Sequence, residues 1–118
     1  MLRVGSIVIR VADLPRMTAF WAEALDYVPR EDPADPSVDF VLLHPRSGVG
    51  PNVSLDAVPS RYELPPRIHL DLYSDDRTAE AARLIALGAR EVHWSKRPAD
   101  ADYVILEDLE GNRFCVVG

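Results

Sequence analysis

The chain has 118 residues, a hydrophobic fraction of 47% and a formal net charge of −6. This length suits one ordinary domain, and the apolar fraction is high enough for a packed core, which excludes a disordered chain. The 13 basic residues form no block, so we expect no nucleic-acid-binding face. No apolar run approaches the roughly 20 residues of a membrane-spanning helix, and the N-terminus lacks a signal-peptide pattern.

The single cysteine, Cys115, cannot form an internal disulfide. A reducing compartment is therefore the default, and we expect a cytoplasmic protein that contacts no membrane.

The first half of the chain predicts a strand, a helix and three further strands. The strands are expected at 6–11, 27–29, 39–44 and 52–58, with polar loops at 31–37 and 45–51. Asp13 would cap the helix, which runs to about Leu25. Its apolar face would carry Met17, Phe20, Trp21, Ala24 and Leu25.

Residues 59–66, which end in two prolines, predict a linker, and the pattern then restarts. Strands are expected at 67–73, 90–94, 103–107 and 113–117. The helix expected at 77–87 would be capped by Asp75 or Asp76 and ended by Gly88. Its inner side would carry Ala81, Ala82, Leu84 and Ile85.

The two halves align with almost no gaps. Ser6 falls on His69 and Asp13 on Asp76, both 63 positions apart, and residues 39–43 fall on 102–106 at the same offset. With a two-residue shift in the last strand, Ser54 falls on Cys115. We therefore predict an α+β fold of two tandem βαβββ modules in a single domain, 1–118, with module one at about 1–58 and module two at about 67–118. A single sheet without duplication is the alternative.

The first strand of each module alternates between two faces. In the second module, Ile68, Leu70 and Leu72 would face a helix. The opposite face would place His69, Asp71 and Tyr73 in one row, which is a plausible lining for a small polar cavity. The matching row in module one is Ser6, Val8 and Arg10.

Three sequence motifs are typical of a known family: "VADL" before a helix with "AFW", "RIHLDLYSDD", and the ending "LEDLEGNRFCVV". Together with the duplicated modules they resemble the vicinal oxygen chelate superfamily, which includes glyoxalases, bleomycin-resistance proteins and extradiol dioxygenases. The resemblance covers nearly the whole chain and points to the small glyoxalase-like branch. It implies a cup-shaped, curved mixed sheet.

The resemblance also implies a divalent metal (Zn, Ni, Mn or Fe) held in the cup by His or Glu on the first and last strands of each module. Other proteins of this fold bind hydrophobic drugs without a metal. Many form dimers, so we expect a homodimer.

Carried over to this chain, the implied ligand positions are only partly kept. His69 fits, whereas Ser6 stands where His is expected and Cys115 where Glu is expected. The remaining position is Ser54 by the repeat alignment, or Asp56 if the loop absorbs two more residues. The predicted metal set is thus His69, Asp56 and Cys115, with Ser6 and Ser54 as degenerate positions.

Each of these residues also has a structural interpretation. His69 could be a hydrogen-bonded cavity histidine, and Cys115 a small buried hydrophobic residue. Arg10 and Asp71 could recognise a polar ligand, or form an ion pair or solvated rim.

Aromatic residues complete the predicted cup lining. Phe40, Tyr73 and Tyr103 could line the cup or simply pack in strands. His93 and Trp94 could form a lid or an ordinary strand edge. No catalytic residue is assigned.

The sequence therefore predicts a glyoxalase-like protein that binds a small molecule in its cup, with degenerate metal-ligand positions. One alternative is a metal-dependent lyase or isomerase of the glyoxalase type. The other is a drug-sequestering protein of the bleomycin-resistance kind.

Overall fold

The computed structural model describes residues 4–57 and 69–118. The chain divides into two compact units, 1–62 and 63–118, and each is described by itself. The predicted linker at 59–66 and the first two residues of the strand predicted at 67–73 lie outside the described residues.

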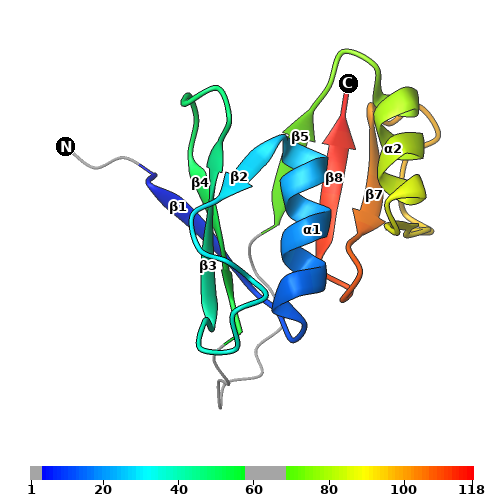
Figure 1. The fold of residues 1–118 in the computed structure, drawn as a ribbon. Coiled ribbons are helices and arrows are strands. Elements are labelled where there is room, and N and C mark those ends of the chain that lie inside the picture. Colours follow the sequence, from blue (N-terminus) through cyan, green and yellow to red (C-terminus); the bar gives the residue numbers. More distant parts are fainter. Residues whose placement is uncertain (1–3, 58–68) are drawn as a thin grey trace. The chain divides into compact units, whose positions relative to one another are not determined.

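Module one contains a helix and a four-stranded mixed sheet (Figure 1). Its elements are β1 (Ser6–Arg10), α1 (Leu14–Leu25), β2 (Tyr27–Pro29), β3 (Phe40–Pro45) and β4 (Asn52–Asp56). The strand order is β1-β4-β3-β2. The pair β1–β4 is parallel and the other two pairs are antiparallel. Helix α1 packs against β2, β3 and β4.

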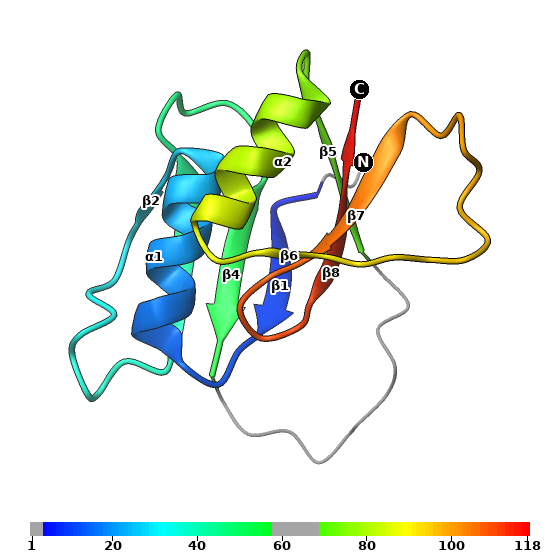
Figure 2. The same ribbon diagram turned by 90° about the vertical axis from the view of Figure 1, so that its right-hand side faces the viewer.

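Module two repeats this topology (Figures 1 and 2). Its elements are β5 (Leu70–Tyr73), α2 (Arg77–Ala86), β6 (Arg90–Glu91), β7 (Tyr103–Glu107) and β8 (Arg113–Val117). The order is β5-β8-β7-β6, again with a parallel first–last pair, and α2 packs against β7 and β8. The predicted α+β fold of two βαβββ modules is confirmed.

Most predicted boundaries are close, but several strands are shorter than expected. β1 ends at Arg10, β4 at Asp56, and β3 begins and ends one residue later than predicted. β5 begins at Leu70, so His69 directly precedes it. α2 ends at Ala86.

The strand predicted at 90–94 is wrong beyond its first residues. β6 covers only Arg90–Glu91. The Val92 amide still donates to the Ile105 carbonyl at 2.8 Å, but the Trp94 carbonyl already accepts from Arg97 in a turn, at 3.0 Å. Trp94 therefore belongs to the loop between β6 and β7, which extends away from the sheet (Figure 2).

Both helices begin at the residues that the sequence indicates. Asp13 accepts a hydrogen bond from the Arg16 amide at 3.1 Å, and Asp76 accepts one from the Ala79 amide at 3.0 Å. These carboxylates satisfy amides that have no partner within the helix. The caps lie at equivalent positions of the two modules, and they fix where each helix starts after its first strand.

Each module has its own apolar core. In module one the predicted face of α1 buries Met17, Phe20 and Trp21, and the last two rings meet edge to face with centroids 5.2 Å apart. In module two the buried residues are Leu84, Ala89, Leu106, Phe114 and Val116. The prediction that Ile85 and Ala82 face inward is wrong, because both are exposed and α2 turns only a narrow side, centred on Leu84, to the sheet.

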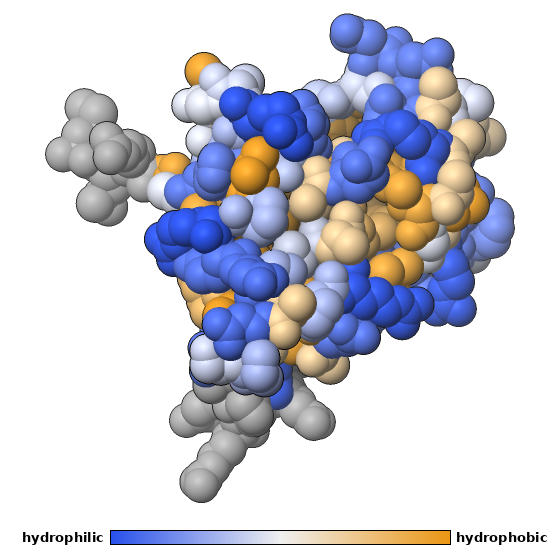
Figure 3. All heavy atoms as spheres, in the orientation of Figure 1, coloured by the Kyte–Doolittle hydropathy of each residue, from blue (hydrophilic) through white to orange (hydrophobic). Residues whose placement is uncertain are grey.

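The surface is mixed in character. Hydrophilic residues cover most of the face drawn in Figure 3, and apolar residues show between them, as is usual for folded proteins. Neither of the helices in the described part of the chain has the length and apolar content that a membrane crossing requires.

The turn between β7 and β8 is built around a buried carboxylate. Asp108, 2% exposed, accepts from the amides of Glu110 and Asn112 at 2.9 Å each and from the Asn112 side chain at 2.8 Å. Such charge-assisted bonds hold a buried carboxylate in place. The turn thereby fixes the register in which Ile105 faces Cys115.

We expect Gly88→Ala to destabilise the protein. Gly88 has φ +116, which strains any other residue, and an added Cβ would clash with the Leu109 side chain. Urea denaturation should show a loss of about 1–3 kcal/mol.

Gly5→Ala is the matched control, because a Cβ there meets nothing within 4 Å. It should change stability by less than about 0.5 kcal/mol. Equal effects of the two substitutions would contradict the assigned conformation of Gly88.

Candidate functional site

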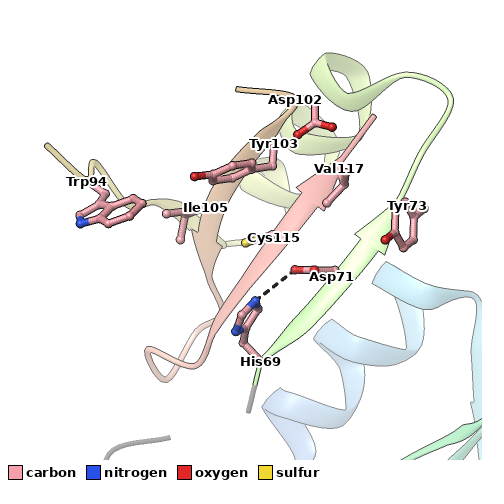
Figure 4. A pocket seen from close by; sticks show the side chains of 9 residues that line it. All are labelled: His69, Asp71, Tyr73, Trp94, Asp102, Tyr103, Ile105, Cys115 and Val117. Carbon is pink, nitrogen blue, oxygen red and sulfur yellow. Dashed lines mark ion pairs between the residues drawn. The ribbon is translucent and has the colours of Figure 1, made fainter. Parts of the chain in front are cut away.

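A hollow of about 370 Å³ lies over one face of the module-two sheet (Figure 4). Its lining comes from β5, β7, β8, the residue preceding β5 and the β6–β7 loop. The lining residues are His69, Asp71, Tyr73, Trp94, Asp102, Tyr103, Ile105, Cys115 and Val117. Its volume lies near the lower end of the range for small-molecule sites.

Strand register places most of these side chains in two rows across the sheet. Asp71 pairs with Cys115, which pairs with Ile105 on its other side. In the next row, Val117 lies between Tyr73 and Tyr103. Because alternate residues of a strand share a face, both rows point into the hollow while Phe114 and Val116 face the core.

His69, Asp71 and Cys115 form a compact cluster at one end of the hollow (Figure 4). The imidazole Nε2 lies 3.1 Å from Asp71 Oδ1. One potential ligand atom from each of the three residues lies within 4.8 Å of the other two. The side chains of His69 and Asp71 are 59% and 48% exposed, so a molecule in the hollow can reach them.

The environment of Cys115 keeps its thiol protonated. Burial raises the pKa of Cys115, and the negative charge of Asp71 and a hydrogen bond to that carboxylate raise it further. The predicted structural interpretation of Cys115 as a buried hydrophobic residue needs correction, because the residue is only half-buried and lines the hollow.

Aromatic side chains form the other end of the hollow (Figure 4). Trp94 is 49% exposed. Its loop is held by Arg97, whose Nε donates to the Tyr103 carbonyl at 2.8 Å and whose guanidinium lies 5.5 Å from the centroid of the Tyr103 ring. Arg97 therefore fixes the loop against β7, next to the strand that supplies Tyr103 and Ile105.

Module one carries different chemistry at the equivalent positions. Val8 pairs with Ser54 there, as Asp71 pairs with Cys115, which supports the repeat alignment of Ser54 with Cys115. The hydroxyls of Ser6 and Ser54 are hydrogen-bonded to each other, with their oxygens 2.6 Å apart. Ser54 is 1% exposed whereas Ser6 is exposed, so this pair is a partly buried polar contact.

The predicted site residues divide between the modules. The hollow brings together five of them: His69, Asp71, Tyr73, Tyr103 and Cys115. Arg10, Phe40 and Asp56 belong to module one, where Asp56 is the register partner of the other two. Their roles in binding or in metal coordination stay predictions.

Four lining residues were not assigned to the cup from sequence. Ile105 and Val117 share a strand face with Tyr103 and Cys115, so strict alternation would have found them. Trp94 was considered only as part of a lid or strand edge, and Asp102 precedes a predicted strand. No local sequence pattern indicates which residues of the β6–β7 loop line the hollow.

The divalent metal implied by the family fits the two modules unequally. In module one the implied ligand positions hold two neutral hydroxyls already bonded to each other. In module two, His69, Asp71 and Cys115 offer nitrogen, oxygen and sulfur, a donor set that zinc accepts. Zinc would have to displace the thiol proton, which the raised pKa of Cys115 opposes and the charge of the ion favours.

Comparison with known proteins identifies the family. The sequence profile described as "glyoxalase-like domain" matches residues 6–117. The chain belongs to the glyoxalase-like domain family. No curated protein matches the sequence significantly.

Solved structures with this fold include members of the wider superfamily. A glyoxalase/bleomycin resistance protein/dioxygenase superfamily member from Sphaerobacter thermophilus is 24% identical, with a TM-score of 0.70, over 99% of this chain and 97% of its own. A glyoxalase/bleomycin resistance protein/dioxygenase family enzyme from Burkholderia phytofirmans is 17% identical, with a TM-score of 0.69, over 95% of this chain and 94% of its own. TnmS3, an antibiotic binding protein from a Streptomyces species, is 23% identical, with a TM-score of 0.67, over 99% and 95%. At these identities the likeness supports the glyoxalase-like, vicinal oxygen chelate fold.

We expect Asp71→Asn to lower the pKa of Cys115, because it removes the negative charge that disfavours the thiolate. The pH dependence of iodoacetamide alkylation, measured with a chelator present, should move to lower pH.

Glu91→Gln is the matched control, since this exposed carboxylate pairs with the core residue Leu106 and so lies on the other face of the sheet. It should leave the alkylation profile unchanged. An identical profile for Asp71→Asn and the parent protein would contradict the coupling between Asp71 and Cys115.

Proposed function

We propose that this glyoxalase-like protein binds a small, flat, partly apolar organic molecule in the module-two hollow without requiring a metal. The observation that carries the proposal is the lining itself: apolar and aromatic side chains around a volume of about 370 Å³, with a few polar groups among them. Such a combination is typical of small-molecule sites.

The two ends of the hollow suit different parts of a ligand. Trp94 and Tyr103 offer aromatic surfaces, and Ile105 and Val117 offer an apolar floor. Burial of ligand carbon there supplies affinity at roughly 25 cal/mol per Å² of apolar area. His69 and Asp71 would orient a polar substituent.

A half-exposed tryptophan supports this assignment. Trp21 is 1% exposed and belongs to the core, whereas Trp94 is 49% exposed and lines the hollow. A large exposed aromatic side chain beside a hollow is a common feature of binding surfaces. A drug-sequestering role is one biological use of such a site, and TnmS3, of the same fold, is an antibiotic binding protein.

The test uses acridone, a neutral fluorescent tricycle, as the probe. We expect Trp94→Ala to weaken its binding, measured by fluorescence anisotropy, roughly tenfold because an aromatic contact is lost. Ile85→Ala, an exposed apolar residue on α2, is the control and should bind like the parent. Unchanged affinity in Trp94→Ala would exclude the hollow as the site.

The second candidate function is a zinc-dependent lyase or isomerase of the glyoxalase type. The observation that favours it is the His69–Asp71–Cys115 cluster, which offers three ligands and leaves a fourth position for substrate. Zinc held there would supply Lewis-acid polarisation of a carbonyl group. The metal-free proposal is preferred because Ser6 and Ser54 satisfy each other in module one, which leaves the module-two cluster as the candidate metal site among the described residues.

Metal content separates the two candidates. If the zinc site exists, protein purified without chelator should retain one equivalent of zinc by elemental analysis, and His69→Ala should lose it. His93→Ala is the control, because this exposed histidine of module two is not part of the cluster. Equal zinc content in the parent and His69→Ala would remove this candidate.

We further propose a cytoplasmic homodimer, as the sequence and the family resemblance predict. Strands β1 and β5 are edge strands of their own sheets, and such edges tend to acquire partners. The oligomeric state stays a prediction that sedimentation at micromolar protein concentration decides.

A further inference from the structure

The charged groups that line the hollow are mainly acidic. Its nine lining residues include two carboxylates, Asp71 and Asp102, and one imidazole, but no lysine or arginine. Asp102 is exposed, and its carbonyl accepts the Gly118 amide at 2.9 Å, which ties it to the end of β8. Between residues 69 and 118 the sequence has ten acidic and six basic residues, so the surrounding surface is also acidic.

The basic residues near the hollow lie outside its lining. Arg77 donates to the Ala101 carbonyl at 3.1 Å, and Arg97 donates to the Tyr103 carbonyl. Arg113 shares a strand face with Cys115 and lies level with His69 in the β5–β8 register, with Glu107 as its register partner on β7, but it is not part of the lining. These guanidinium groups reduce the negative potential without forming part of the lining.

The remaining polar groups do not change this balance. Cys115 adds a thiol, which supplies no positive charge in either protonation state. His69 lies 3.1 Å from Asp71 and would offset that carboxylate only when protonated. An anionic ligand would therefore meet Asp71 and Asp102 without a cationic partner in the lining.

Aromatic rings complete the recognition chemistry. A cation over an aromatic face gains roughly 0.5–1 kcal/mol at exposed sites. The protein already uses such a contact, since the Arg97 guanidinium lies over the Tyr103 ring. The half-exposed indole of Trp94 offers a second aromatic group in the same hollow.

We propose that the hollow selects a flat organic cation, whose rings contact Trp94 and Tyr103 and whose positive charge is met by Asp71 and Asp102. This inference rests on the proposed binding function and names the class of its ligand. It excludes carboxylate-bearing and other anionic molecules as preferred ligands, because electrostatic complementarity sets specificity in such a site.

The experiment compares three tricycles of similar shape and different charge: cationic 9-aminoacridine, neutral acridone and anionic acridine-9-carboxylate. Binding is measured by calorimetry at about pH 8 with a chelator, where an ordinary imidazole is neutral. We expect the cation to bind roughly tenfold tighter than acridone and the anion to bind more weakly than acridone. The cation's advantage should decrease with added salt.

Isosteric variants assign the preference to the two carboxylates. Asp102→Asn and Asp71→Asn should each reduce the ratio of cation affinity to acridone affinity severalfold, because each removes one negative charge from the lining. Glu91→Gln removes the same charge from the opposite sheet face and should keep the full preference.

The results distinguish a failure of the cation inference from a failure of the proposed binding function. Equal affinity for all three probes, or a preference for the anion, would overturn the cation inference while leaving the binding function in place. A cation preference that persists in both aspartate variants would also overturn it. No binding of any probe would overturn both proposals.

Discussion

The parallel pairing of the first and last strands is the constraint on which the site depends. In each module these strands are neighbours in the sheet although their paired residues lie 46 positions apart in module one (Ser6 and Asn52) and 44 apart in module two (Leu70 and Phe114). A parallel pair needs a long crossover connection, and the helix and the other strands of the module supply it. The pairing sets Asp71 beside Cys115, and β7 then adds Ile105 on the far side. Without this register the lining residues would share no surface.

The same frame carries different chemistry in its two copies. In module one the positions of His69 and Cys115 are taken by two serines whose hydroxyls bond to each other, with valine at the position of Asp71. In module two, the same positions bring together an imidazole, a carboxylate and a thiol. The two modules thus share the same strand pairing at these positions. The side chains that could act on a ligand are concentrated in module two.

Zinc and an organic cation would compete for the same residue of the module-two cluster. Zinc would need the thiolate of Cys115 and the carboxylate of Asp71, and binding of an organic cation would need that same carboxylate free. Burial, and then the charge of Asp71 and a hydrogen bond to it, raise the pKa of Cys115. Together with the aromatic wall at the other end of the hollow, this favours ligand binding over metal chemistry as the proposed use of the site.

The sequence by itself determined the repeat, the helix caps and the faces of the strands. Asp13 was predicted to cap the first helix, and Asp75 or Asp76 the second, because a short acidic side chain satisfies free amides locally; the structure uses Asp13 and Asp76. His69, Asp71 and Tyr73 were placed on one face because alternation is a property of any strand. These features depend only on residues close in the chain.

Only the tertiary structure decided which of these residues meet. The parallel β5–β8 register brought Cys115 beside Asp71, and the β7–β8 turn around Asp108 placed Ile105 on its other side. The β6–β7 loop, held by Arg97, placed Trp94 in the lining of the hollow, although the sequence indicated the end of a strand or a lid. Packing of α2 left Ile85 exposed despite its helical spacing. Each of these outcomes depends on contacts between distant segments, which local pattern does not specify.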